Sequence, residues 1–313
     1  MNLKSVNTTA SPVSSFLLLI VLMLVGSLVG TLLGLVTAAF VTGTSDLNYI
    51  FAALGNPAAD LTFFRIVQAG SSIGMCVAPP LLLGLVEGNI RTYVRMDGGL
   101  KVLDYLLVFI LALCSGPIIE LVGSWNAQLS LPERFGELER WMMEQEKQLE
   151  VITLQILSDI SIGGLFANLL VIAVIPAIGE ELLFRGALQQ ILVRWFRNPH
   201  VGIWVAAIIF SAIHLQFYGF LPRMLLGALF GYLYYWSNNI WLPIFAHFVN
   251  NAGVLITAFV LQKQGKVLED MNYLDGISVS WYFISFVATA GLLWFLKQRL
   301  QPRVHKNIIQ HGK

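Results

Sequence analysis

Apolar stretches of about 20 residues recur along this chain, and short clusters of charged side chains separate them. An α-helix needs this length to cross the hydrocarbon core of a bilayer. The composition agrees, because 57% of the residues are hydrophobic, only 12% are charged and the mean hydropathy is +0.73. An ordinary water-soluble domain carries about 25% charged residues and is excluded. We therefore predict an all-α fold, a polytopic bundle of transmembrane helices with the lipid bilayer as its main partner.

About eight membrane helices are expected from the apolar stretches. They fall at 16–41, 64–87, 102–123, 161–184, 201–215, 221–237, 240–262 and 279–297. The fifth and sixth are short for a full span, and only Ser237-Asn238-Asn239 separates the sixth from the seventh. Tilted or partly re-entrant helices, and a count of seven, are therefore alternatives in this region.

The lysines and arginines between these segments indicate an orientation. One side of the membrane receives Lys4, Arg91, Arg95, Lys101, Arg194, Arg197, Lys297, Arg299, Arg303, Lys306 and Lys313 if all eight segments cross. The positive-inside rule makes that side the cytoplasm, so both termini are predicted to be cytoplasmic in the cell (plasma or inner) membrane. A net charge of +1 gives no sign of nucleic-acid binding, and we expect no nucleic-acid partner.

The longest polar segment, 125–159, would lie on the opposite side. It is rich in glutamate, and Pro132 and Glu133 are typical of a helix start. Apolar residues then recur at roughly helical spacing, which indicates an amphipathic helix lying on the membrane or on the bundle.

Three successive apolar stretches carry polar side chains that are costly inside a membrane. The fourth segment holds Glu180, Glu181 and Arg185, the fifth holds His214, and the seventh holds His247 and Asn251. A charged group at the centre of a membrane helix costs about 2.5–3.5 kcal/mol on insertion scales, so each of these residues suggests a function.

Each residue also has an ordinary interpretation. Glu181 and Arg185 could pair near the interface, either histidine could make a helix–helix hydrogen bond, and Asn251 could join two helices. Their concentration on three elements favours a site. Such a set can perform hydrolysis, in which a partly desolvated glutamate takes a proton from water and a histidine holds that water. The alternative is a divalent metal such as zinc, bound by Glu180, His214 and His247, that activates the water.

The three patterns resemble the motifs of a known family. Glu180-Glu181-x-x-x-Arg185, Phe210-x-x-x-His214 and His247-x-x-x-Asn251 are similar, in order and spacing, to those of the CAAX-protease and bacteriocin-processing (CPBP, or Abi) family of intramembrane endopeptidases, which includes type II CAAX prenyl endopeptidases. The resemblance covers roughly residues 160–260. It suggests three regions: N-terminal transmembrane helices with the amphipathic helix (1–159), a CAAX-protease-like catalytic core (160–262), and a last transmembrane helix with a basic cytoplasmic tail (263–313).

The resemblance also implies roles for the residues. Glu180 would be the general base, with Glu181 and Arg185 as its electrostatic support. His214 would orient the water, while His247 and Asn251 would stabilise the oxyanion. The family is described both as metalloproteases and as glutamate-dependent proteases, so the metal question stays open at this point.

The implied substrate is a membrane-associated peptide or a prenylated protein. We expect the cut near the cytoplasmic side, because Glu180 lies at the cytoplasmic end of its predicted segment. Two other functions fit the same residues. Glu180, Glu181, His214 and His247 could form the pathway of an ion- or proton-coupled transporter, or the chain could confer peptide immunity by sequestration, without catalysis.

Overall fold

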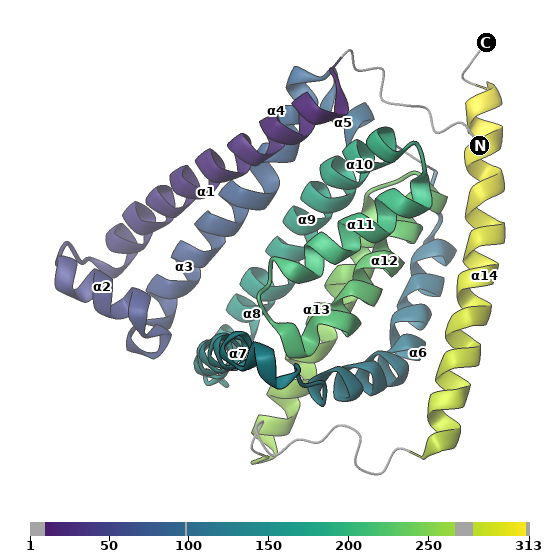
Figure 1. The fold of residues 1–313 in the computed structure, drawn as a ribbon. Helices are drawn as coiled ribbons and strands as arrows, with labels where there is room; N and C mark the ends of the chain where they lie inside the picture. The colour runs from purple at the N-terminus through teal and green to yellow at the C-terminus, as the bar shows by residue number, and fades with distance from the viewer. Residues whose placement is uncertain (1–9, 98, 267–277, 311–313) are drawn as a thin grey trace.

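The computed structural model describes residues 10–97, 99–266 and 278–310, and it contains helices and no strand within these ranges (Figure 1). The α-helices are α1 (Pro12–Thr42), α2 (Leu47–Gly55), α3 (Leu61–Ser72), α4 (Ala78–Val86), α5 (Ile90–Tyr93), α6 (Val102–Ala127), α7 (Gly136–Leu157), α8 (Ile162–Asn168), α9 (Ile175–Glu181), α10 (Gln189–Phe196), α11 (Pro199–Ala212), α12 (Phe220–Ser237), α13 (Trp241–Lys263) and α14 (Val279–Gln310). The 3₁₀ turns are η1 (Pro57–Ala59), η3 (Glu133–Phe135) and η6 (Phe217–Gly219), and the π-helical segments are η2 (Ile73–Val77), η4 (Leu169–Val174) and η5 (Leu182–Leu188). The predicted all-α fold is confirmed.

Six helical runs in the described part of the chain are long and apolar enough to cross a membrane, judged by length and composition. These runs are Pro12–Thr42, Leu61–Val86, Val102–Ala127, Ile162–Phe196, Trp241–Lys263 and Val279–Gln301. The fifth and sixth predicted segments are helices but do not qualify. α11 has only 14 residues. α12 carries Arg223 in its first turn and ends in tyrosines and a tryptophan, and these residues lower its mean hydropathy.

The fourth span is longer than the sequence predicted. The helix continues past residue 184 to Phe196, because the polar side chains that seemed to end it are buried and bonded to neighbouring helices. The Gln189 amide donates to the Gly231 carbonyl at 3.2 Å, and the Gln190 amide donates to the Tyr93 carbonyl at 2.6 Å. Glu180 therefore lies near the middle of this 35-residue run. The reason given for a cut near the cytoplasmic side is wrong.

Glycines allow α1 and α3 to pack with their backbones in direct contact. Gly26, Gly30 and Gly34 on α1 face Gly70 and Gly74 of the α3–η2 run. A Cβ added at Gly30 would overlap the Gly70 carbonyl oxygen, and one added at Gly74 would overlap the Gly26 carbonyl oxygen. Small residues of this kind are the usual means by which membrane helices approach closely. The resulting α1–α3 arm extends beside the rest of the bundle (Figure 1).

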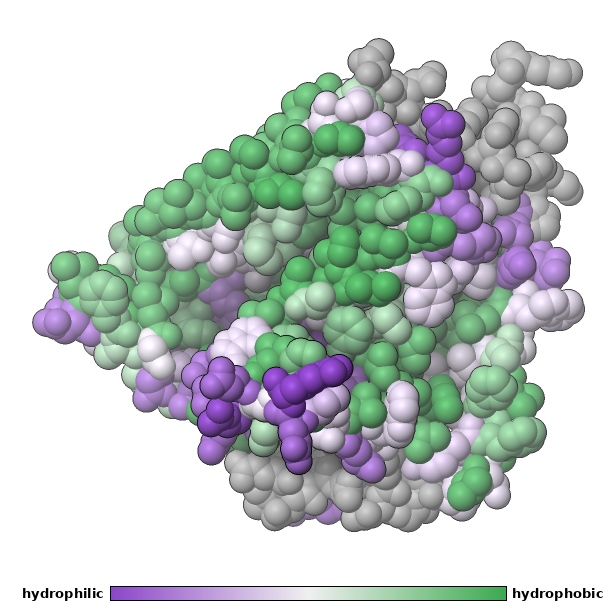
Figure 2. Space-filling model, viewed as in Figure 1, coloured by the Kyte–Doolittle hydropathy of each residue, from purple (hydrophilic) through white to green (hydrophobic). Residues whose placement is uncertain are grey.

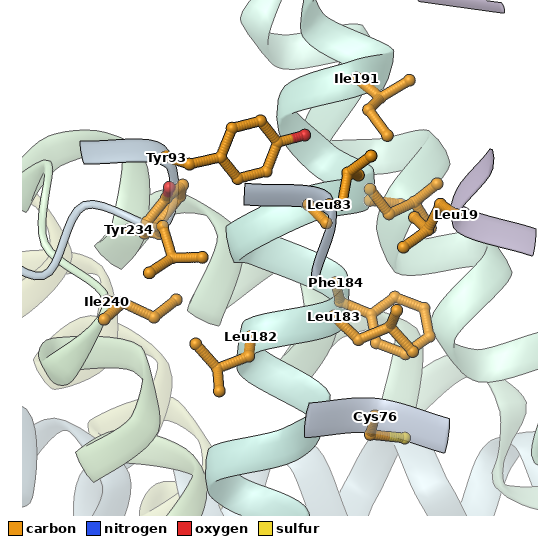
Figure 3. Close-up of a cluster of buried hydrophobic side chains, with 14 of the residues drawn as sticks. Leu19, Cys76, Leu83, Tyr93, Leu182, Leu183, Phe184, Ile191, Tyr234 and Ile240 are labelled. Carbon is orange, nitrogen blue, oxygen red and sulfur yellow. The ribbon is translucent and has the colours of Figure 1, made fainter. Parts of the chain in front are cut away.

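A buried hydrophobic cluster joins this arm to the centre of the bundle. The three consecutive side chains Leu182, Leu183 and Phe184 of η5 lie in it (Figure 3). Leu19 of α1, Leu83 of α4, Tyr93 of α5 and Tyr234 of α12 pack into the same cluster. The stretch that directly follows Glu181 is therefore fixed from several sides.

The helix α6 bends along its length (Figure 1), and its sequence and contacts give the cause. Pro117 lies inside the helix, where its ring disturbs the backbone hydrogen bonds. The Ser285 hydroxyl of α14 enters this region, accepting a hydrogen bond from the Ile118 N–H at 3.2 Å and donating one to the Cys114 carbonyl at 2.6 Å. Ser285 of the neighbouring helix α14 thus bonds backbone groups on both sides of Pro117.

The predicted amphipathic helix is present as α7, which begins after Pro132 and Glu133. Figure 1 shows α7 almost end-on while the long helices run across the view, so α7 crosses one end of the bundle. Hydrophilic side chains gather over it, whereas hydrophobic side chains cover the outer surface of α1 (Figure 2). The predicted helix is therefore present, and its position on the membrane stays a prediction.

The predicted basic side corresponds to the other end of the bundle. Arg194 pairs with Glu87 at 3.2 Å and also donates to Ser15, which joins the end of α10 to α4 and α1. Arg299 of α14 pairs with Asp104 of α6 at 2.6 Å. Lys4, Lys313 and the side chains of Arg303 and Lys306 lie outside the described residues, and the cytoplasmic location of this end stays a prediction.

Candidate functional site

The first motif lies on a short α-helix with an irregular segment at each end. α9 is preceded by η4 and followed by η5, both π-helical, within one continuous run. Pro176 in its first turn cannot donate a backbone hydrogen bond, which favours such a disturbance. Gly179 lies against η2, where an added Cβ would be 2.9 Å from the Cys76 Cβ. π-Helical turns frequently mark functional sites, and here they set the direction of Glu180 and Glu181.

Glu181 is the centre of a buried ionic network. Its Oε1 accepts a hydrogen bond from Arg185 Nη1 at 2.7 Å and another from His247 Nδ1 at 2.8 Å, and its side chain is 0% exposed. Arg185 Nη2 also donates to the Gly227 carbonyl of α12 at 2.8 Å. The network therefore joins residues of the first and third motifs, as their spacing suggested, and ties them to a fourth helix.

Aromatic rings enclose this network. The Arg185 guanidinium lies over the rings of Phe210 and Phe230, 5.1 and 5.6 Å from their centroids. The His247 ring stacks on Phe230 at 5.2 Å and meets Phe210 edge-on at 6.2 Å. These contacts keep water away from the charges and so strengthen the interaction between them.

Glu180 is in a different state from its neighbour. Successive residues on a helix point about 100° apart, so Glu180 leaves the network that holds Glu181. Its Oε2 lies 3.8 Å from His247 Nε2, its side chain is 20% exposed, and no residue in the described ranges donates a hydrogen bond to it. One carboxylate is thus fixed and buried, while the adjacent one is free to accept a proton.

His214 follows α11 in the loop that leads to η6. Its Nδ1 lies 2.7 Å from the Phe210 carbonyl oxygen, and only a protonated Nδ1 can make that hydrogen bond. In the neutral ring the Nε2 then carries the lone pair and can accept a hydrogen bond. The rings of His214 and His247 both contact Phe210, so the second motif lies beside the other two.

Asn251 and His247 share a helix face but have different partners. The Asn251 amide nitrogen donates to the Ile172 carbonyl of η4 at 3.0 Å, and its oxygen accepts from Asn250 at 3.2 Å. His247 faces the two glutamates instead. The structure therefore gives Asn251 a contact between α13 and η4, as in the ordinary interpretation of this residue as a bond that joins two helices.

The residues suggested as metal ligands are not assembled as a metal site. Within the described ranges, no group of three or more His, Cys, Asp or Glu side chains is placed to hold a metal ion. The Nε2 of His247 approaches a single carboxylate, that of Glu180, at 3.8 Å. The set Glu180, His214 and His247 does not fit a metal in this arrangement.

Sequence reasoning missed Arg223, in the first turn of α12. Its guanidinium donates to the Gln216 carbonyl at 3.2 Å and to the Gln216 side-chain oxygen at 2.6 Å. Its charge interacts with those of Glu180 and Glu146. A charged residue at the start of an apolar segment was the available signal.

Comparison with known proteins agrees with the motifs. Residues 162–253 match a family model described as type II CAAX prenyl endopeptidase Rce1-like, and this range contains every residue of the predicted site. The core of this chain is therefore similar to that family. Six apolar helices around such a core make the chain an integral membrane protein.

A curated relative is similar to part of this chain. The uncharacterized protein YpbD of Bacillus subtilis (strain 168) is 32% identical over 89 residues, which are 27% of this chain and 42% of that protein. The match therefore spans less than half the length of that relative. No solved structure gives a significant match.

Proposed function

We propose that this Rce1-like protein is an intramembrane endopeptidase that hydrolyses a peptide bond in a membrane-associated substrate, in the manner of a CAAX prenyl protease. The observation that carries the proposal is the contrast between two adjacent carboxylates. Glu181 is buried and bonded to Arg185 and His247, whereas Glu180 is partly exposed and accepts no hydrogen bond from the described residues. An unoccupied, poorly solvated carboxylate suits a general base.

The reaction needs one proton carrier. Glu180 takes a proton from water while the water oxygen attacks the scissile carbonyl carbon, which gives a tetrahedral intermediate. When the carbon–nitrogen bond breaks, Glu180 returns that proton to the leaving amine. The products are a carboxylic acid, which then ionises to a carboxylate by releasing the second water proton, and an amine, and the glutamate is restored.

The other motif residues then have supporting roles. Glu181 and Arg185 hold His247 so that its Nε2 faces Glu180, and Phe210 orients His214 so that its Nε2 can accept a hydrogen bond from the attacking water. With a proton on Nε2 as well as on Nδ1, His247 donates a hydrogen bond to the developing oxyanion, and Asn251 contributes to it through its remaining amide hydrogen. Its bond to Ile172 would also hold α13 against η4.

The proposed reaction uses no metal, because no three of the His, Cys, Asp and Glu side chains in the described ranges are grouped to hold one. We place the general base in the middle of a membrane span, so the substrate must bring its peptide bond into the bundle. A lipid-anchored C-terminus, prenylated in the type of substrate that the family description names, meets that requirement.

The test is cleavage of a quenched fluorescent prenylated CAAX peptide by purified protein in detergent, with the products identified by mass spectrometry. We expect wild type and the exposed α7 variant Glu150→Gln to cleave the peptide. Glu180→Gln should lower kcat at least a hundredfold, because the loss of a general base typically lowers the rate by about 10²–10⁴-fold. Proton flux in proteoliposomes that needs Glu180, with no cleavage of any peptide, would instead favour a transporter.

A further inference from the structure

The loop that carries His214 is held by residues outside the three motifs. It runs from the end of α11 at Ala212 to the start of α12, and Leu215 within it has a φ of 54°. Non-glycine residues rarely adopt this left-handed conformation, so the loop needs external contacts to keep its shape. Its contacts come from α6, α7 and α12.

Two polar side chains, one buried and one half-buried, supply several of these contacts. Asn126, at the end of α6, donates to the Phe217 carbonyl at 3.0 Å and accepts from the Leu221 N–H at 2.6 Å. Arg223 binds both oxygens of Gln216, at 3.2 and 2.6 Å. A planar guanidinium that bonds two oxygens of one residue fixes both position and direction, which a single donor does not.

Arg223 also carries a positive charge that acts on the proposed base. Arg185 is paired with Glu181 at 2.7 Å, whereas no described carboxylate lies within ion-pair distance of Arg223. The charges of Glu180 on α9 and Glu146 on α7 both act on Arg223. The charge of Arg223 also acts on His214. His247 on α13 is the other titratable group that acts on His214.

We propose that Arg223 is a positioning residue for the hydrolytic site: its guanidinium fixes the His214 loop through Gln216, and its charge stabilises the carboxylate of Glu180. This inference rests on the proposed function for its catalytic consequence, but not for its structural one. Arg223 stabilises the negative charge that Glu180 carries before it takes a proton, and it holds the histidine that contacts the same water. Both effects act on the chemical step and not on substrate contact.

The structural part is tested without a substrate. Thermal unfolding at pH 8 in detergent is measured for wild type, Arg223→Gln, Glu180→Gln and the double variant. We expect Arg223→Gln to lower Tm by about 2–4 °C. In the Glu180→Gln background the same change should lower Tm by less than half as much, because the Glu180 carboxylate that Arg223 would stabilise is then gone. The matched control is a second cycle with Glu150 on α7, where the two changes should add.

The catalytic part is tested on the cleaved CAAX peptide. Arg223→Gln is expected to lower kcat at least tenfold with KM within a factor of two, and Arg223→Lys, which keeps the charge, should recover part of that loss. Gln216→Ala removes the side-chain bond to Arg223 and leaves both the backbone bond and the charge, so it should lower kcat less than Arg223→Gln does.

The outcomes separate the two claims. Additive Tm changes in the Arg223–Glu180 cycle would overturn the inference whether or not any peptide is cut. If kcat for Arg223→Lys is no higher than that for Arg223→Gln, the claim that the charge of Arg223 matters would be overturned. If wild type cleaves nothing but the cycle is non-additive, the proposed function fails while the link between Arg223 and Glu180 stands.

Discussion

At the scale of single residues, the structure separates two neighbouring glutamates by their surroundings. Replacing Glu181 by Gln leaves the buried Arg185 guanidinium without its carboxylate, and breaking a buried pair in this way costs about 3–5 kcal/mol. Replacing Glu180 by Gln breaks no hydrogen bond in the described structure. We therefore expect Glu181→Gln to lower Tm by several degrees and Glu180→Gln to leave it almost unchanged, as measured by dye-detected unfolding in detergent. Equal losses of Tm would show that Glu180 is also a structural residue.

Residue spacing alone predicted which side chains would share a helix face, but not which atoms each side chain would bond. Four-residue spacing placed Glu181 with Arg185 and His247 with Asn251 on common faces, and the first pair is bonded as expected. In the second pair, His247 bonds Glu181 and Asn251 bonds the Ile172 carbonyl. That carbonyl belongs to a π-helical segment, and helix periodicity of 3.6 residues carries no information about such a segment.

At the scale of elements, the glycine contact between α1 and α3 gives a sharp prediction. Gly30→Ala forces the two backbones apart, so we expect a loss of about 1–3 kcal/mol in stability, seen as a lower Tm. Gly291→Ala on α14 is the matched control, since an added Cβ there meets nothing within 4 Å. If Gly30→Ala and Gly291→Ala unfolded at the same temperature, the close approach of α1 and α3 would be contradicted.

A charged contact between α3 and the turn after α7 should make stability depend on pH. Asp159 pairs with Arg65 at 3.2 Å, and hydrogen bonds from Ser161 together with the Arg65 charge hold the pKa of Asp159 below its usual range. A lowered carboxyl pKa adds stability above the ordinary aspartate pKa of about 3.9, and this stability is lost as the pH falls through the folded-state pKa. Asp159→Asn should therefore lower Tm at pH 7 and make little difference at pH 3. A difference of the same size at both values would exclude the ionised aspartate as the cause.

The helix boundaries show where the sequence was sufficient and where it was not. Apolar length correctly gave a helical element at each predicted segment, but the fourth span was cut short at residue 184. Arg185, Gln189 and Gln190 looked like a polar boundary, whereas each is buried and bonded to another part of the chain. Tertiary contacts of this kind cannot be read from local hydropathy.

At the scale of the whole molecule, α7 and the basic side lie at opposite ends of the bundle (Figure 1). Glu180 lies between them, near the middle of its 35-residue run, whose last turns carry Arg194. If the basic end is cytoplasmic, α7 lies on the outer side. In a Cys76→Ala, Cys114→Ala background, an impermeant thiol reagent on intact cells should label Glu144→Cys and not Thr92→Cys. Labelling of Thr92→Cys alone would reverse the orientation.

The central claim is that Glu180 activates water for peptide-bond cleavage without a metal. The most direct measurement is cleavage of the prenylated CAAX peptide in ¹⁸O-labelled water, with and without a chelator, by wild type, Glu180→Gln and Glu150→Gln. We predict one ¹⁸O in the new carboxylate, full activity with the chelator for wild type and Glu150→Gln, and no product from Glu180→Gln. Cleavage that persists in Glu180→Gln, or that stops when the chelator is added, would contradict the account.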